Sequence, residues 1–374
     1  MLPPTLLHHI ILIFLHFLTL LSTNASSPQK IKSTSLAPAL FVFGDSLVDN
    51  GNNNLLPTIA RANYSPYGLD FPTKVLPGRF TNGRTPADFI AEYLELPYPP
   101  PYASLYRPNL LTGYNYASGA SGILPETGSL FGKCFNLDEQ IGMFQSTIES
   151  QLGPYFKEQK QLKQHLSKSI YFLSVGNNDY LNNYLHPLYL ESKVYDPPHF
   201  AHFLIDELSL RLQRLYGLGA RKFLVSEVGP IGCIPIFARG VTTNLNHKHG
   251  TKCDDGANNI LLLFNKQLIE MIKILETTLQ DSHFILLQTY SFSYDAIMNP
   301  AKYGLSDSSN PCCKTWLNGT SSCIPEEAPC QNPNNHYFWD GYHPTELVYS
   351  RLSAQCIHGS SLCVPLNLSH LVQL

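Results

Sequence analysis

The sequence predicts an α/β fold, a three-layer α/β/α sandwich with a central parallel sheet. Short apolar runs, typical of strands buried on both faces, alternate with longer segments whose apolar residues recur at helical spacing. This alternation indicates a parallel sheet that is covered by helices on both faces. No linker, repeat or low-complexity tract is long enough to divide the chain, so we expect one domain over residues 26–374.

Four apolar runs are the predicted strands. They are rich in aromatic and branched side chains, which favour strands. Parallel strands end at the same edge of a sheet, and ligands bind beyond these carboxyl ends. The residues that directly follow each run are therefore the first candidates for a functional site. The four runs cover residues 39–43, 170–175, 222–226 and 283–287.

Two longer segments are the predicted covering helices. The first lies between the second and third strands and has Gly217 as its C-terminal stop. The second lies between the third and fourth strands, where Asp254 or Asp255 can cap its first turn. The apolar positions are Leu204, Leu208, Leu212 and Leu215 in the first helix, and Ile260, Phe264, Leu268, Met271, Leu275 and Leu279 in the second.

Residues 1–25 are predicted to be a secretory signal peptide. Residues 6–21 are mostly Leu, Ile and Phe, and small polar residues follow up to a cleavage site near Ala25. Because no Lys or Arg precedes the apolar run and histidines interrupt it, an uncleaved anchor is the alternative. The run is short for a membrane span, which needs about 20 residues. We therefore expect a secreted, extracellular protein with no membrane span after cleavage.

The composition indicates a globular domain with little net charge. Hydrophobic residues make up 44% of the 374 residues, enough for a sizeable core, and the formal net charge is −3. Acidic and basic residues are nearly balanced and no basic block occurs, so we expect no nucleic-acid partner. The sequence indicates no oligomeric state.

The chain has nine cysteines, which fits an oxidising compartment. Most should pair there, and the odd number leaves at least one unpaired. Cys233 and Cys253 bracket one loop, and four cysteines cluster within residues 312–330. Acceptor triplets for N-glycosylation also support secretion. The acceptors in the mature chain are Asn63, Asn318 and Asn367.

A metal site at His247, His249 and Cys253 is an alternative interpretation of one polar segment. Structural zinc sites need four ligands in a fixed geometry, and no matching second pair accompanies these three residues. We expect a solvated loop with Cys253 in a disulfide, and no metal or other cofactor.

Ser46 directly follows the first predicted strand, in the turn Gly44-Asp45-Ser46. This position presents a hydroxyl at the edge of the sheet, where α/β enzymes place a nucleophile. Gly-Asp-Ser is also an ordinary turn composition. The second glycine of the G-x-S-x-G elbow is absent, which argues against the α/β-hydrolase fold.

His343 is the candidate general base for Ser46, and Asp340 is placed to orient its ring. Pro344 favours a helix that starts with itself at the first position. His343 would then lie at a rigid helix start, where the helix dipole favours the neutral imidazole that a base requires. The alternative is that both residues merely cap this helix. Its apolar stripe is Leu347, Val348 and Leu352.

Two further loops could stabilise an oxyanion. Residues 174–179 follow the second strand, and an Asn side chain there could donate its amide at the same edge of the sheet. Residues 115–122 are small and polar, and their glycines would let a backbone N–H approach the substrate closely. Either loop seen alone would more often be a plain turn.

Together these segments resemble the GDSL, or SGNH, hydrolase family, and within it the plant GDSL esterase/lipase group. The resemblance covers about the whole mature chain and implies the flavodoxin-like SGNH-hydrolase architecture. The matching segments are residues 43–46, 49–53, 115–119, 176–179, 229–233 and 338–344.

The resemblance implies a role for each matching site residue. Ser46 is the expected nucleophile and first oxyanion donor, His343 the base and Asp340 its orienter. Gly119 is expected to give a backbone N–H to the oxyanion and Asn178 a side-chain amide, although Gly122 is close to Gly119. No reactive residue departs from the family pattern, so nothing in the sequence suggests an inactive enzyme.

The resemblance therefore implies a secreted serine esterase or lipase that hydrolyses lipid or other acyl esters through an acyl-enzyme on Ser46. Two alternatives stay open. An acyltransferase would use the same residues and replace water by another hydroxyl. A secreted glycoprotein with a vestigial site would only bind its ligand.

Overall fold

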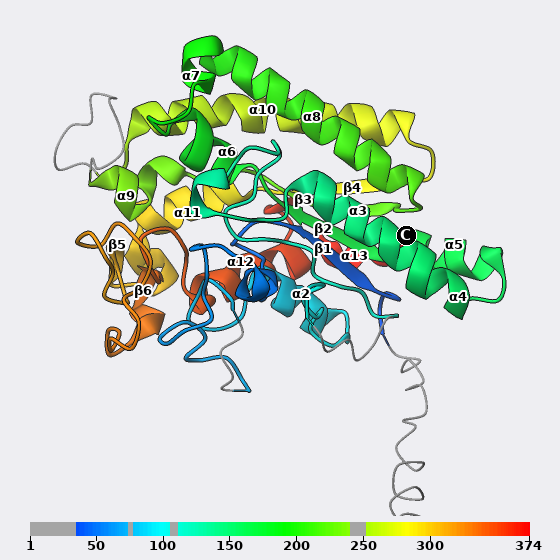
Figure 1. The fold of residues 1–374 in the computed structure, drawn as a ribbon, viewed down its shortest axis with the longest axis horizontal. Helices are drawn as coiled ribbons and strands as arrows, with labels where there is room; N and C mark the ends of the chain where they lie inside the picture. The colour runs from blue at the N-terminus through cyan, green and yellow to red at the C-terminus, as the bar shows by residue number, and fades with distance from the viewer. Residues whose placement is uncertain (1–34, 74–77, 105–110, 240–251) are drawn as a thin grey trace, which may run out of the picture. The chain divides into compact units, whose positions relative to one another are not determined.

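The computed structural model describes residues 35–73, 78–104, 111–239 and 252–374. Residues 36–374 form one compact unit (Figure 1). The signal peptide predicted for residues 1–25 lies outside the described residues, so the domain boundary at residue 26 stays a prediction.

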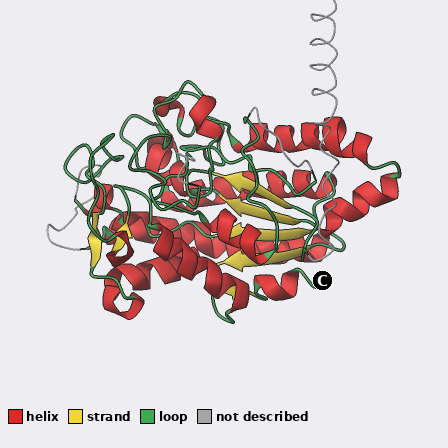
Figure 2. Ribbon diagram, turned by 90° about the horizontal axis from the view of Figure 1, so that it is seen from below, coloured by secondary structure: helices red, strands yellow, loops and turns green. Residues whose placement is uncertain are grey.

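A central sheet of five strands runs through this unit (Figure 2). The first four strands in the order are parallel, as predicted, and their positions agree with the expected runs to within a residue. The fifth strand pairs antiparallel at the edge and was not predicted, because two residues carry no readable periodicity. The order is β1 (Leu40–Gly44), β2 (Ile170–Ser174), β3 (Lys222–Ser226), β4 (His283–Leu287) and β7 (Cys363–Val364).

A further segment, residues 112–118, runs along the free edge of β1. Leu40 N–H donates to Thr112 C=O and Val42 N–H to Tyr114 C=O, both at 3.0 Å. Ser118 N–H donates to Gly44 C=O at the same distance. These bonds bring the loop after residue 118 to the carboxyl end of β1, beside Ser46.

Helices cover both faces of the sheet, so the predicted three-layer α/β/α sandwich is confirmed (Figures 1 and 2). Two helix ends follow the expected signals, because α8 ends at Gly217 and Asp254 caps α10. The N-cap of α8 is Asp196, which the sequence analysis did not single out. One layer contains α3 (Leu137–Thr147), α8 (Pro197–Gly217) and α10 (Asp255–Thr278), and the other contains α2 (Pro86–Tyr93), α12 (Glu346–His358) and α13 (Leu368–Leu371).

Shorter elements complete the unit. Seven 3-10 or π turns, including η1 (Asn52–Leu55), connect the larger elements of the described chain. A two-stranded sheet pairs β5 with β6 away from the central sheet. The remaining helices and strands are α4 (Gly153–Tyr155), α5 (Gln159–Lys168), α6 (Asn177–Asp179), α7 (Glu191–Val194), α9 (Pro235–Ala238), α11 (Thr289–Met298), β5 (Asp307–Pro311) and β6 (His336–Phe338).

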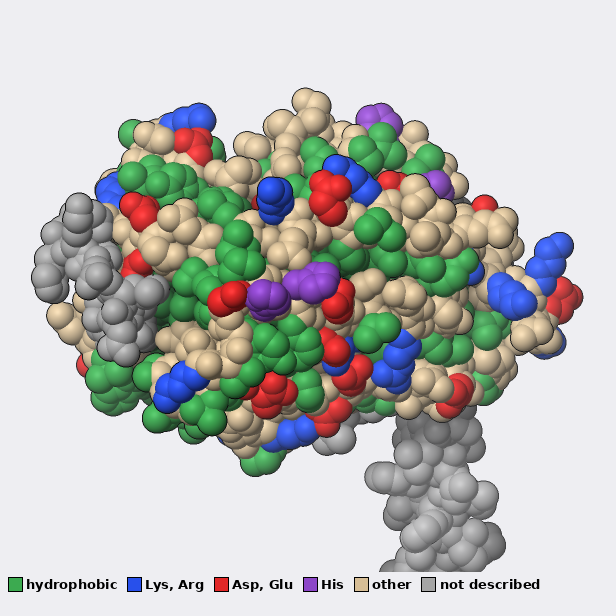
Figure 3. Space-filling model, turned by 90° about the horizontal axis from the view of Figure 1, so that it is seen from above, with side chains coloured by type: hydrophobic (Ala, Val, Ile, Leu, Met, Phe, Trp, Pro, Cys, Tyr) green, Lys and Arg blue, Asp and Glu red, His purple; other side chains and the backbone are tan. Residues whose placement is uncertain are grey.

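An aromatic cluster joins the sheet to the layer of α3. The Phe144 ring on α3 lies 4.9 Å from Phe41 and 5.8 Å from Phe43 on β1, measured between ring centroids. All three side chains are fully buried. On the outer face of α8 and α10, acidic and basic side chains are interspersed (Figure 3).

Eight of the nine cysteines form disulfides and Cys134 is free, which agrees with the expectation from the odd number. Two of the bridges fall within residues 312–330 and fold this segment into a loop module around β5. Cys253 is in a disulfide, as expected. The pairs are Cys233–Cys253, Cys312–Cys330, Cys313–Cys323 and Cys356–Cys363.

The helix after the predicted base begins later than the sequence suggested. Pro344 was expected at its first position, but α12 begins at Glu346 with Thr345 as the N-cap. Pro344 instead forms an antiparallel bridge with Phe338, and Thr345 N–H donates to Tyr337 C=O at 2.9 Å. Because of these two contacts the chain stays extended up to Thr345, and the helix begins only after this residue.

Gly44 should not tolerate a side chain. Its φ is +143°, and a Cβ would lie 2.0 Å from the Ser174 carbonyl oxygen on the neighbouring strand. We expect Gly44→Ala to lower the free energy of unfolding by roughly 3 kcal/mol or more. Gly217→Ala is the matched control, because a Cβ there meets no atom within 4 Å and alanine favours the helix. Denaturant unfolding of both variants measures this, and equal stabilities would contradict it.

Candidate active site

The structure brings Ser46, His343 and Asp340 together. Ser46 Oγ lies 2.8 Å from His343 Nε2, although the two residues are 297 positions apart. His343 Nδ1 lies 2.9 Å and 2.8 Å from the two Asp340 carboxylate oxygens. A proton on Nδ1 satisfies the carboxylate and leaves Nε2 free to accept from the serine hydroxyl.

The Asp340 carboxylate is completely buried and is held by several donors. Its Oδ1 accepts the backbone N–H groups of Tyr342 and His343 at 2.9 Å and 2.8 Å. Its Oδ2 accepts the Tyr67 hydroxyl at 2.5 Å. A buried charge requires such donors, and together they fix the plane of the carboxylate against the imidazole ring.

The Gln140 side chain, on α3, forms two hydrogen bonds with the backbone at the end of β1. Its Oε1 accepts the Gly44 N–H at 2.8 Å, and its Nε2 donates to the Gly44 C=O at 2.9 Å. The side chain is fully buried. The backbone two residues before Ser46 is therefore held by a distant side chain, and no local sequence signal marks Gln140 for this task.

Asp45 places a second carboxyl group beside the imidazole. Its Oδ1 accepts the Leu47 N–H at 3.0 Å, while its Oδ2 is buried without a hydrogen-bond partner among the described residues. Burial raises the pKa of Asp45 to about 7, against a smaller opposing effect of the nearby His343. The charge beside the site therefore changes near neutral pH.

Two of the expected oxyanion donors are suitably free. The Ser46 N–H has no hydrogen-bond acceptor among the described residues. One N–H of the Asn178 amide donates to Ser121 C=O at 3.0 Å, and Asn178 Oδ1 accepts from Asn182 at 2.6 Å. These two bonds fix the amide and leave its second N–H available, because an amide nitrogen carries two donors.

The Gly119 amide differs from the expectation. It donates to Asp49 Oδ2 at 2.9 Å, so its single proton is already used. Asp49 also accepts the N–H groups of Gly51 and Asn52, both at 2.8 Å. The next residue, Ala120, lines the cavity with a φ of +69°, and its N–H has no acceptor in the described part of the chain. Ala120 is therefore the better donor by geometry.

The Asp179 carboxylate binds the residues that follow Ala120 in this loop. Its carboxylate accepts the N–H groups of Ile123 and Leu124 and the Thr127 hydroxyl at 2.8 to 3.0 Å. Burial raises the pKa of Asp179, and that of Asp49, to about 6. Both aspartates lie inside the sequence segments that carry the family resemblance, but their type and spacing alone indicated no role.

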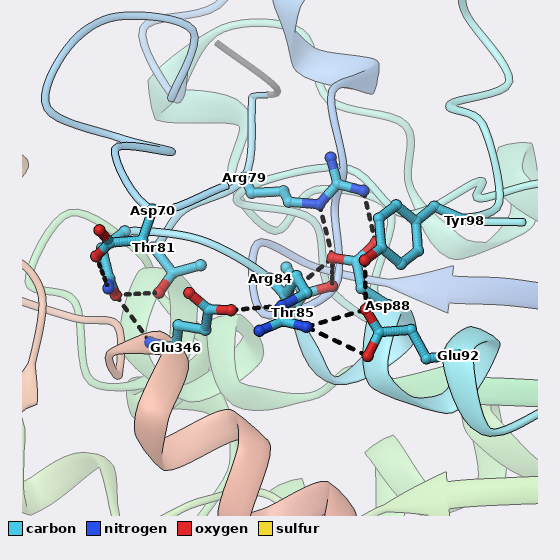
Figure 4. Close-up of polar contacts among 10 residues, drawn as sticks. Asp70, Arg79, Thr81, Arg84, Thr85, Asp88, Glu92, Tyr98 and Glu346 are labelled. Atoms are coloured by element: carbon cyan, nitrogen blue, oxygen red, sulfur yellow. Dashed lines mark hydrogen bonds and ion pairs between the residues drawn. The ribbon is translucent and has the colours of Figure 1, made fainter. Parts of the chain in front are cut away.

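The loop before α2 contacts the chain directly after His343, at Pro344 and Glu346 (Figure 4). Thr81 Oγ1 donates to Pro344 C=O at 2.9 Å. Asn82 Oδ1 accepts the Glu346 N–H at 2.8 Å, which satisfies a free donor at the start of α12. Arg84 forms an ion pair with the Glu346 carboxylate at 2.5 Å. The loop before α2 therefore fixes the chain directly after His343.

A buried ion pair holds this supporting loop itself. Arg79 binds the Asp88 carboxylate in a bidentate manner, at 2.7 Å and 2.6 Å (Figure 4). Asp88 also accepts the Thr85 N–H at 2.8 Å, which caps α2. Both charged side chains are buried, so removing either one would leave an uncompensated charge.

A cavity of about 420 Å³ opens beside the paired serine and histidine. Most of the residues that line it are apolar. Ile59 and Trp316 at its mouth are 78% and 54% exposed, whereas Phe172 on β2 and Leu352 on α12 at its inner wall are buried. The cavity therefore leads from the surface past Ser46 into the space between the sheet and α12.

The remaining predicted sites have different outcomes. His247 and His249 lie outside the described residues. Among the described residues one Cys and His group has ligand-like spacing, but its two cysteines form a disulfide and offer no free thiolate; the group is Cys312, Cys330 and His336.

The three glycosylation acceptors differ in accessibility. Asn318 is exposed and Asn63 is half-buried. The Asn367 side chain caps α13 and its Nδ2, the atom that would carry a glycan, donates to Gly359 C=O at 3.0 Å. Glycosylation stays a prediction, and Asn318 is the most accessible of the three acceptors. In the described part of the chain, none of the helices has the length and apolar character that crossing a bilayer requires.

Comparison with known proteins identifies the family. The model of the GDSL-like Lipase/Acylhydrolase family matches residues 40–355. A protein of Arabidopsis thaliana, GDSL esterase/lipase 7, is 45% identical over 319 residues, which cover 84% of this chain and 85% of that protein. Two further Arabidopsis thaliana proteins, each also called a GDSL esterase/lipase, share 39% and 38% identity.

These two matches extend over 360 and 356 residues, or 94% of this chain in both cases and 91% and 95% of the relatives. The similarity thus covers β1, the segment that carries His343 and nearly everything between them. This chain belongs to the GDSL esterase/lipase family of carboxylic ester hydrolases.

Proposed function

We propose that this protein is a secreted serine esterase or lipase that cleaves esters of apolar acyl groups through an acyl-enzyme on Ser46. The observation that carries the proposal is the hydrogen-bonded chain from Ser46 Oγ through His343 to Asp340 in the wall of an apolar cavity. A nucleophile, a base and an orienting acid in this arrangement perform acyl transfer.

In the proposed reaction Ser46 Oγ attacks the ester carbonyl while His343 Nε2 takes its proton. Asp340 keeps the ring oriented and stabilises the imidazolium that forms. The ring then returns the proton to the departing alcohol, which leaves an acyl group on Ser46. Water is activated by the same nitrogen and releases the carboxylic acid.

The oxyanion of each tetrahedral intermediate needs donors that are already in place. We assign this task to the Ser46 N–H, the Ala120 N–H and the Asn178 amide. Gly119 supports the task indirectly, because its bond to Asp49 fixes the turn that presents Ala120. Ser118 N–H and Ser121 Oγ both donate to Gly44 C=O, which holds this turn against the end of β1.

The shape of the cavity favours an apolar acyl chain as its occupant. The cavity is of the size that binds small organic ligands, and burial of a hydrocarbon chain against Phe172, Leu352 and their neighbours releases ordered water. The exposed Ile59 and Trp316 at the mouth extend the apolar surface outward. The alcohol part would remain on the side of the mouth.

Several features support secretion. The four disulfides require an oxidising compartment to form and persist. The predicted leader at residues 1–25 and the exposed acceptor Asn318 fit the same route.

The nucleophile is tested by covalent labelling. A fluorophosphonate should label Ser46 in the folded mature protein, and Ser46→Ala should lower kcat for ester hydrolysis by roughly 10⁴–10⁶. The measurement is mass spectrometry of the labelled peptide together with steady-state kinetics. Labelling at another serine, or full hydrolysis by the variant, would contradict the assignment.

The oxyanion donor is tested at Asn178. Asn178→Ala should lower kcat by roughly 10²–10³ and change KM little, because the amide acts mainly on the transition state. Asn265→Ala is the matched control: this buried amide also makes backbone bonds, to Val228, but does not line the cavity. An effect confined to KM, or an equal loss of kcat in the control, would remove the assignment.

The acyl site is tested with esters of one alcohol and acyl chains of graded length. Leu352→Phe should fill the inner end of the cavity and lower kcat/KM for long acyl chains about fourfold more than for acetate, since the larger side chain displaces roughly one methylene, which contributes about 0.8 kcal/mol. The short ester is the internal control. Equal losses for all chain lengths would show that the acyl chain lies elsewhere.

A further inference from the structure

The Tyr67 hydroxyl lies between the Asp340 carboxylate and the disulfide loop of residues 312–330. It donates to Asp340 Oδ2 at 2.5 Å and accepts the Cys323 N–H at 3.3 Å. The ring is fully buried. Tyr67 is 273 positions away from Asp340 in the sequence and lies outside every segment that indicated catalysis.

We propose that Tyr67 is a positioning residue of the active site, whose hydroxyl orients and stabilises the Asp340 carboxylate so that Ser46, His343, Asp340 and Tyr67 work as one hydrogen-bonded unit. The inference rests on the proposed function, because it concerns how the general base of that reaction is tuned.

The direction of the Tyr67 bond is determined by its neighbours. An ionised carboxylate can only accept, so the hydroxyl proton goes to Asp340, and a backbone N–H can only donate, so the hydroxyl oxygen accepts from Cys323. Burial raises the pKa of the Tyr67 hydroxyl well above its ordinary value, so the group keeps this proton throughout the working range. The Tyr67 hydroxyl therefore remains a hydrogen-bond donor to Asp340 throughout this pH range.

The two oxygens of Asp340 depend on different groups. Oδ1 is held by the backbone of its own segment, through Tyr342 and His343. Besides the imidazole ring, Oδ2 has Tyr67 as its one hydrogen-bond donor among the described residues. Tyr67 thus ties the carboxylate to the rest of the fold, and without it Oδ2 would depend on His343 alone.

The surroundings hold the Tyr67 ring firmly. It packs edge-on against Tyr64 at 5.2 Å and Phe80 at 6.2 Å between ring centroids, and Phe80 lies 5.2 Å from the His343 ring. On its other side, Cys323 is bonded to Cys313, whose N–H donates to Trp339 C=O next to Asp340. The disulfide loop of residues 312–330 therefore helps to fix the position of the Tyr67 hydroxyl.

Other ionisable groups also face this site. Asp45, at the end of β1, lies close enough to His343 for the imidazole to oppose the rise of its pKa. Burial, with a further contribution from the Asp340 charge, raises the pKa of three tyrosines: Tyr64 in a neighbouring loop, Tyr342 in the segment of Asp340 and Tyr349 on α12. Of these groups, Tyr64 also interacts with the Tyr67 hydroxyl, which lowers the Tyr64 pKa, but burial raises that pKa to about 12. Tyr64 therefore stays neutral in the working range with or without the Tyr67 hydroxyl, and the change in the pH profile reports the loss of the Tyr67 donor.

Tyr67→Phe removes the donor and keeps the ring. A less firmly oriented carboxylate should lower kcat/KM about 10- to 100-fold, the loss typical of one hydrogen bond to a charged group. A carboxylate with one donor fewer also attracts the protonated imidazole more strongly. The acid limb of the profile of kcat/KM against pH should therefore move upward by about half to one pH unit.

The matched control is Tyr171→Phe. This tyrosine is also fully buried, and its hydroxyl donates to Leu166 C=O, remote from the cavity. Its loss should lower stability without moving the acid limb. An unchanged profile in Tyr67→Phe, or an equal shift in the control, would overturn the role of Tyr67. The proposed function would still stand, provided that wild type shows Ser46-dependent hydrolysis.

A second variant covers the case in which Tyr67→Phe does not fold. A difluorotyrosine at position 67 retains the ring and is a stronger donor, so it should move the acid limb in the opposite direction, to lower pH. A shift upward, or none, would overturn the proposal. If the wild-type protein shows no hydrolysis that depends on Ser46, the proposed function itself fails.

Discussion

The organisation of this active site depends on the requirement that a buried carboxylate be surrounded by hydrogen-bond donors. The loops at the carboxyl edge of the sheet are not held by strand pairing. Three buried aspartates accept the hydrogen bonds of their backbone N–H groups instead. Asp340 gathers backbone groups and Tyr67 around the imidazole ring. Asp49 and Asp179 gather six donors from the loops of residues 51–52 and 119–127. Each carboxylate therefore determines the shape of a loop that borders the candidate site.

This construction explains how the proposed nucleophile, Ser46, can lie at the end of a strand and still be held rigidly. The Gly44 backbone is bound by Gln140 on one side and by the turn at residues 118–121 on the other. The His343 segment is fixed separately, by Thr81 and Asn82 from the loop before α2. The two halves of the site belong to different layers of the sandwich, and the hydrogen bond between Ser46 and His343 joins them. Such rigid support is what a preorganised site requires.

We propose that the cavity selects the substrate of the proposed reaction. Its walls come from the end of the central sheet, from α12 and from the disulfide loop, so the same elements that hold His343 also shape the cavity. A change in the loop that carries Trp316 could therefore alter substrate access without disturbing Ser46. Asp45, whose pKa burial raises to about 7, also lies in the wall of this cavity, next to Ser46 in the chain.

The sequence by itself determined the four parallel strands, the end of α8 at Gly217, the cap of α10 and the candidates Ser46, Asn178, Asp340 and His343, because periodicity, capping residues and family motifs are local properties of the chain. Only the tertiary structure decided that the Gly119 amide is used by Asp49, that α12 begins at Glu346 and that β7 closes the edge of the sheet. The same holds for Gln140 and Tyr67, which meet their partners across 96 and 273 residues. A hydrogen bond between segments so far apart leaves no pattern in either one, since what selects the residue is the position of a partner that only folding brings near.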